Sequence, residues 1–217
     1  NGINATDSKL ASVSNAANTG FITNAQRGIS LTSTQVSGAV SNAGTITATT
    51  AGIIVNGGSA GTVTNAATGK ITVTAANADA IVITNSSVGT EISNAGELRA
   101  TRSGINLDTV TGTAAVINSG LITAASGTLT AGISAANSQL ASLANQGGGL
   151  IEKTVTGISL SGTTITGAVS NDATINANQT GINIASSSAV GSVQNTGNGK
   201  ITVTAANADA IVITNSS

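Results

Sequence analysis

The chain of 217 residues contains no cysteine, histidine, methionine, proline, tryptophan or tyrosine, and its one phenylalanine is Phe21. Without Cys and His there is no disulfide, no zinc or haem site built on thiolate or imidazole, and no Ser-His or Cys-His nucleophile. Only 7% of the residues are charged, seven basic against eight acidic. Because basic residues are few and scattered and no aromatic side chains could stack on bases, we expect neither nucleic-acid binding nor a cofactor or metal.

Long hydrophobic runs are missing as well. The longest aliphatic stretch covers residues 80–83, far below the ~20 apolar residues of a membrane-spanning helix, so we expect no membrane insertion of this segment. The hydrophobic content of 40% and the net charge of −1 favour an ordered chain over a disordered one. The sequence does not start with Met and shows no signal peptide, so we expect a segment from the interior of a longer protein.

The sequence repeats at two levels. Residues 69–87, GKITVTAANADAIVITNSS, return unchanged at 199–217, so that residues 1–217 form one continuous array of about 1.7 copies of a 130-residue unit. Within that unit, an aliphatic residue stands two places before an Asn about every 26 residues. The eight Asn are Asn15, Asn42, Asn65, Asn94, Asn118, Asn145, Asn171 and Asn195.

Each short period has two more aliphatic landmarks. The first follows the Asn, at Ile22, Ile46, Ile71, Leu98, Ile122, Ile151, Ile175 and Ile201. The second follows a Gly or Ala, at Ile29, Ile53, Ile81, Ile105, Ile133, Ile158, Ile182 and Ile211, and a further apolar residue stands two places later. A spacing of two residues is typical of β-strands, and no helical periodicity is present.

A unit with three short strands and few aliphatic residues has to stack on its neighbours to bury them. The pattern predicts an all-β fold, a single-stranded parallel β-helix (β-solenoid) with three sides, about 26 residues per coil and 8 to 9 coils. Coils at a strand spacing of ~4.8 Å would form a rod roughly 40 Å long. We expect a right-handed wind by analogy with parallel crossover connections.

The recurrent Asn and Gly have structural interpretations. A carboxamide carries donors and an acceptor, so identical Asn residues stacked at the strand spacing can bond to each other as a ladder, and Asn tolerates the left-handed conformation of a sharp corner. We therefore expect the eight Asn to hold coils together rather than to bind a ligand. The Gly before the second landmark is replaced by Ala80 and Ala210, so close packing, not positive φ, is its expected role.

The departures from regularity are the candidate exposed loops. The separation of the two landmarks is longer than usual in the coils of Ile71, Ile122 and Ile201, and the extra residues are expected to bulge outward. The candidate loop residues are Thr74, Ala75, Ala76, Asn77, Asp79, Ser126, Gly127, Thr128, Asn207 and Asp209. Their composition favours a spacer role over a binding role.

The densest group of charges is Lys70, Glu91, Glu97, Arg99 and Arg102. A polysaccharide-active β-helix enzyme would need paired carboxylates, and Glu91 with Glu97 is the nearest approach to such a pair. A surface ion-pair cluster is the favoured reading, because no aromatic side chain is present to hold a sugar ring. Thr-x-Thr columns also suggest an ice-binding solenoid, but Arg99 and Glu152 interrupt the Thr column.

The phrases VSNAGTITATTAGIIV (40–55) and ISNAGELRATRSGINL (92–107) resemble the passenger repeats of bacterial autotransporters and two-partner-secretion exoproteins, which are large adhesins of Gram-negative bacteria. The resemblance covers essentially the whole chain. It implies a rod-like stalk outside the cell at the bacterial surface, with roles in adhesion, aggregation or biofilm. Together with the scattered acidic residues, it favours a structural or adhesive rod, which could form filaments, and we expect no enzyme. The implied partners are flanking repeats of the parent chain, other copies placed laterally or head to tail, and a host or cell-surface receptor.

Overall fold

The computed structural model describes residues 1–216 and consists of parallel β-strands, turns and loops. The strands are β1 (Ile3–Thr6), β2 (Lys9–Leu10), β3 (Val13–Asn15), β4 (Phe21–Thr32), β5 (Gln35–Asn42), β6 (Thr45–Asn56), β7 (Ser59–Asn65), β8 (Lys70–Val73), β9 (Asp79–Asn94), β10 (Glu97–Ala100), β11 (Ser103–Gly112), β12 (Ala115–Asn118), β13 (Leu121–Ala124), β14 (Leu129–Ala136), β15 (Gln139–Leu140), β16 (Ser142–Asn145), β17 (Leu150–Ser161), β18 (Thr164–Asn171), β19 (Thr174–Ala185), β20 (Ala189–Asn195), β21 (Lys200–Val203) and β22 (Asp209–Ile213). The predicted β-solenoid is confirmed.

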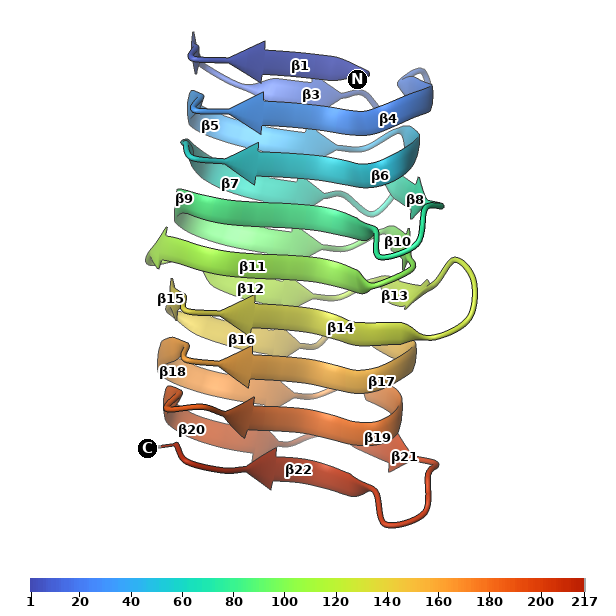
Figure 1. Cartoon of the computed structure of the whole chain (residues 1–217), viewed down its shortest axis with the longest axis vertical. Coiled ribbons are helices and arrows are strands. Elements are labelled where there is room, and N and C mark those ends of the chain that lie inside the picture. Colours follow the sequence, from blue (N-terminus) through green and yellow to red (C-terminus); the bar gives the residue numbers. More distant parts are fainter. Residues whose placement is uncertain (217) are drawn as a thin grey trace.

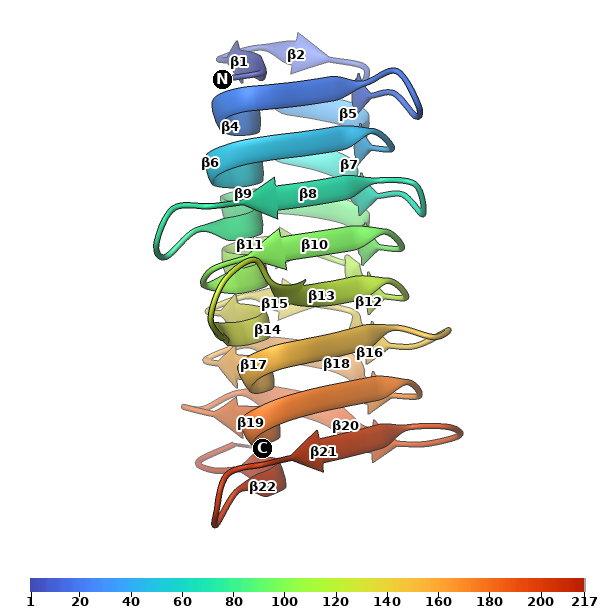
Figure 2. The same cartoon turned by 90° about the vertical axis from the view of Figure 1, so that its right-hand side faces the viewer.

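The chain winds as a three-sided coil. Figure 1 shows the near strands running from right to left and the more distant strands from left to right as the chain descends from N to C, which is a right-handed wind. We call the face with the Val-x-Asn strands face A, the face with the Ile22 to Ile201 landmarks face B, and the face with the Ile29 to Ile211 landmarks face C. Face C is turned toward the viewer in Figure 1, and face B is turned toward the viewer in Figure 2.

Each landmark column lies in register from coil to coil. On face C, Ile3 pairs with Ile29, which pairs with Ile53, and the file continues without a break to Ile211. Faces A and B have equivalent files, because the coils differ in length only at their corners and loops. Interior members of these files are inaccessible to solvent, and they form one continuous hydrophobic core.

Close packing explains the glycine before each face C landmark. A Cβ built on Gly28 would lie 2.3 Å from Cγ2 of Ile46, and one built on Gly104 would lie 2.3 Å from Cγ2 of Ile122. Neither glycine has a positive φ. Two groups of the next coil therefore limit the space: the β-branch of the face B isoleucine, and the backbone carbonyl of the equivalent glycine, which is 2.5 Å away at Gly52 O and 2.9 Å away at Gly132 O.

At one interior pair of coils, both the glycine and the isoleucine that packs against it are replaced. Ala80 replaces the glycine, and the next residue down the face B column after Ile71 is Leu98 instead of an isoleucine. Leucine has no methyl on Cβ, so it leaves room at the point where a Cγ2 would meet the alanine. Leu98 therefore relieves the side-chain part of the crowding at Ala80.

Candidate functional site

The corner between faces A and B contains a continuous ladder of the eight Asn side chains. The Nδ2 of each Asn donates to the Oδ1 of the Asn in the next coil, at 2.8 Å in all seven steps from Asn15 to Asn195. Most also donate to a backbone carbonyl, as Asn118 does to Gly120 O at 3.1 Å. Six members from Asn42 to Asn171 are at most 1% exposed. The six interior carboxamides are therefore buried polar groups whose hydrogen bonds the ladder itself supplies.

The left-handed backbone conformation lies elsewhere. None of the eight ladder Asn has a positive φ, so the expected advantage of Asn at a sharp corner does not apply to them. Positive φ recurs instead at the corner from face C to face A, at Asp7, Ser33, Gly57, Asn85, Thr109, Asn137, Gly162, Ser187 and Asn215. Left-handed residues do occur in the turns after three ladder Asn, at Asn18, Gly147 and Gly197, but the ladder Asn themselves contribute through their hydrogen bonds.

A second polar column at the face C to face A corner was missed by the sequence reasoning. Directly after each left-handed residue stand Ser8, Thr34, Gly58, Ser86, Val110, Ser138, Thr163, Ser188 and Ser216. The hydroxyl of Ser138 donates to Ala136 O at 2.7 Å and accepts from the N–H of Val110, in the coil above, at 3.0 Å. The signal was available, because a Ser or Thr stands five residues after most face C landmarks.

Asp79 was expected in an exposed loop, and this prediction is wrong. The residue is 2% exposed and begins β9. Arg102 Nε, from the coil below, donates to its Oδ1 at 2.9 Å, Arg102 Nη2 contacts its Oδ2, and Asn106 Nδ2 donates to Oδ2 at 3.0 Å. A buried carboxylate requires such partners, and they lie 23 and 27 residues further along the chain.

The Asp79–Arg102 pair has an electrostatic consequence. The hydrogen bond with Asp79, together with its negative charge, raises the pKa of the Arg102 guanidinium above its ordinary value, against the opposing effect of burial. The stabilisation that this shift represents is complete below the ordinary arginine pKa and is lost only as pH rises through the raised value. The pair therefore keeps its cation throughout the physiological range.

The loop before Asp79 is fastened to the same coil. Thr74, Ala76 and Asn77 are exposed, and Ala75 is half-buried. The Thr101 hydroxyl donates to Ala75 O and accepts from the N–H of Ala78 at 2.9 Å. The other predicted loop residues, Ser126, Gly127, Thr128 and Asn207, are exposed and lie in loops that project beside face B in Figure 1. Asp209 is exposed as well, but it is the first residue of β22 and not part of the loop.

The charge cluster divides into separate parts. Glu97 pairs with Arg99 on face B and stands next to Lys70 in strand register, whereas Arg102 belongs to the Asp79 pair. Glu91 is on face A, in register with Thr62 and Ala115, before the Asn94 corner. Because Glu91 and Glu97 lie on different faces, they are not neighbours in one column of the sheet.

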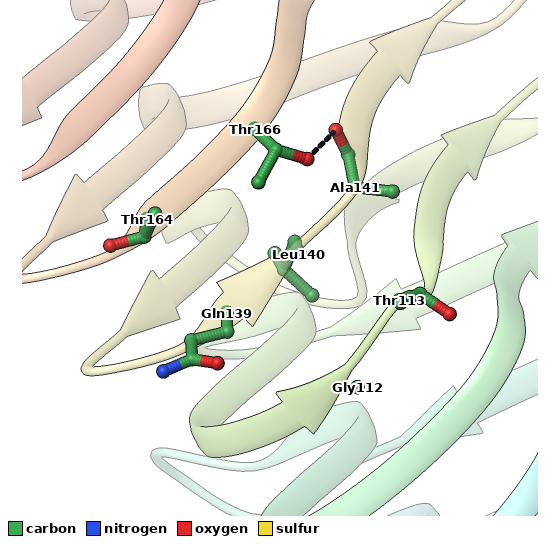
Figure 3. Close-up of a pocket in the computed structure, with 7 residues that line it drawn as sticks. All are labelled: Gly112, Thr113, Gln139, Leu140, Ala141, Thr164 and Thr166. Atoms are coloured by element: carbon green, nitrogen blue, oxygen red, sulfur yellow. Dashed lines mark hydrogen bonds between the residues drawn. The ribbon is translucent and has the colours of Figure 1, made fainter.

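The surface has shallow hollows rather than a deep cleft. One of about 260 Å³ lies on face A between β11, β15 and β18 (Figure 3), lined by Gly112, Thr113, Gln139, Leu140, Ala141, Thr164 and Thr166. Gly112, which lines it, follows Val88 in the strand register. No lining residue is ionisable, and the Thr166 hydroxyl already donates to Ala141 O at 3.4 Å. The hollow therefore holds no ionisable acid or base, and its hydroxyl groups are those of Thr113, Thr164 and Thr166.

Residues 1–216 contain no cluster of three or more acidic residues placed to hold a metal ion. Across the same residues, the structure has no helix with the length and apolar character needed to cross a membrane. Comparison with known proteins adds no relative: no protein-family model, no curated protein and no solved structure matches this chain.

Proposed function

We propose that the chain is a structural and adhesive rod, a length of extracellular stalk at a bacterial surface. The observation that carries this proposal is the uninterrupted stacking of coils by the Asn ladder and the aliphatic files. Each coil contacts mainly its neighbours, so units can be added without changing the cross-section. A 130-residue unit of five coils adds about 24 Å at ~4.8 Å per coil.

The location and partners in this proposal follow from the resemblance of the repeats to autotransporter and two-partner-secretion passengers. Further coils of the same kind would continue the stalk, and a host or cell-surface receptor would contact its sides or its projecting loops. The low charge of 7% and the small polar side chains of the loops suit a spacer that holds a binding region away from the cell.

Two measurements test the two halves of the proposal. Small-angle X-ray scattering on a variant with residues 66–195 duplicated should show a maximum dimension increased by about 24 Å at constant cross-section. Beads coated with the chain should attach to bacterial or host cells more than beads coated with a soluble protein of equal mass. A compact shape would contradict the rod, and attachment equal to the control would contradict the adhesive role.

An enzymatic role is tested separately. The rod proposal expects no polysaccharide cleavage by the purified chain. Cleavage that is lost in Glu91→Gln or Glu97→Gln would favour the enzyme instead. Thermal hysteresis in solution would favour the ice-binding alternative.

A further inference from the structure

The C-terminal end of the described rod has the same sequence as a segment that another coil covers elsewhere in the molecule. Residues 199–216 have the sequence of 69–86, and both copies lie under coils of the same kind, since Ile71 pairs upward with Ile46 and Ile201 with Ile175. The first copy is covered by β10 and β11. Within residues 1–216 no strand covers the second copy.

The difference is large at equivalent positions. Ile81 and Ile83 are fully buried, whereas their counterparts Ile211 and Ile213 are 37% and 54% exposed. Asp79 is 2% exposed, and its counterpart Asp209 is exposed to solvent. We call the surface formed by β21, β22 and the 204–208 loop the end face.

The first copy shows what a covering coil has to supply. Beneath Ala80 it needs Leu98, because an isoleucine would place its Cγ2 against the alanine Cβ. Beneath the 74–78 loop it needs the Thr101 hydroxyl, which contacts Ala75 O and Ala78 N.

The charged groups add to these requirements. The Asp79 carboxylate needs Arg102 and Asn106, because a carboxylate covered without partners is strongly destabilising. Opposite Lys70 stands Glu97, whose charge complements it.

We propose that the end face is an interaction surface for one kind of partner: a β-solenoid coil with Glu, Leu, Thr, Arg and Asn at the positions of Glu97, Leu98, Thr101, Arg102 and Asn106. Since residues 199–216 carry the same groups as 69–86, they require the same side chains in the coil that covers them. The inference rests on the proposed role as an extendable rod, and it names the coil type that extends it.

A second copy of this chain does not provide these side chains at its N-terminal end. In its uppermost described coil, the first strand is β1, which starts at Ile3. Its next coil carries Ile22 and Gln26 at the Leu98 and Arg102 positions. Its arginine, Arg27, stands one place later and is exposed. The end face therefore selects against simple self-stacking while accepting the correct repeat.

The test appends a copy of residues 88–112 after Ser217 and compares it with an appended copy carrying Leu98→Ile and Arg102→Gln. Amide hydrogen exchange of β22 should slow at least tenfold with the first extension and less than twofold with the second. Asp209→Asn should abolish most of the gain in the first extension and change little in the unextended chain.

Equal protection by both extensions, or none by the first, would overturn the proposal. So would sedimentation showing that the unextended chain forms end-to-end dimers at micromolar concentration. If an extended chain fails to fold, the native chain provides the same test, because Leu98→Ile should be destabilising and Ala80→Gly should rescue it. Absence of rescue would also overturn the proposal, whereas the scattering and bead experiments decide the rod and its adhesion independently.

Discussion

Replacing Asn118 by alanine should strongly destabilise the rod. Asn118 accepts from Asn94 at 2.8 Å, donates to Asn145 at 2.8 Å and donates to Gly120 O at 3.1 Å, all in a fully buried column. Three hydrogen bonds at ~1 kcal/mol net each give about 3 kcal/mol. The orphaned Asn145 acceptor adds about 1 kcal/mol or more, so we expect a loss of about 4 kcal/mol in the free energy of unfolding.

The matched control is Asn195→Ala at the exposed end of the same ladder. Asn195 is exposed, accepts from Asn171 and donates to Gly199 O at 2.9 Å, and the Asn171 Nδ2 freed by its removal still donates to Ala173 O at 3.1 Å. We expect a loss of about 1 kcal/mol. Urea unfolding followed by far-UV circular dichroism measures both variants, and hydrogen exchange of the flanking coils reports the local effect. A cost for Asn118→Ala no greater than that for Asn195→Ala would refute the role assigned to the ladder.

Three further substitutions test the packing and the buried charge. Thr154→Val should raise the free energy of unfolding by about 1 kcal/mol in the same urea assay. The reason is that the Thr154 hydroxyl is buried with no hydrogen-bond partner among the described residues. A lower free energy of unfolding in this variant would contradict the prediction. Gly104→Ala should lower the free energy of unfolding by about 2 kcal/mol through its contact with Ile122. In a double-mutant cycle, adding Ile122→Leu should restore at least half of that loss. If the effects of the two substitutions are additive, the interpretation of Ala80 and Leu98 is contradicted. Arg102→Met should cost about 2 kcal/mol in the free energy of unfolding, less than for a fully buried pair because the Arg102 side chain is 44% exposed. Asp79→Asn in the same protein should reduce that cost, and an equal cost in both backgrounds would exclude the ion pair as its cause.

Much of this architecture follows from spacing alone. The files and the ladder are predictable because Asn15 to Asn195 and their aliphatic neighbours recur at nearly constant intervals, and stacking is the way such short strands bury their side chains. The recurrence of Ser138 and its counterparts was equally regular, but it was overlooked because Ser and Thr are common throughout the chain.

The burial of Asp79 could not be predicted from the repeat pattern. The residue follows a loop of polar and small side chains, which favours exposure, and its partners Arg102 and Asn106 occur in one coil rather than in a repeated column. The compensation between Ala80 and Leu98 likewise needs coordinates, since only the position of Cγ2 relative to the neighbouring coil makes the two substitutions dependent.

The vertical stacking of coils is tested most directly by two spin-label distances, which the absence of cysteine makes simple to install. Thr64 and Gln194 occupy one column five coils apart, and Ser14 and Gln194 are seven coils apart in the same column. Double electron–electron resonance on Thr64→Cys/Gln194→Cys and Ser14→Cys/Gln194→Cys should give distances near 24 Å and 34 Å, at ~4.8 Å per coil. Two similar distances, or distributions too broad to separate, would contradict a rod of coils in register.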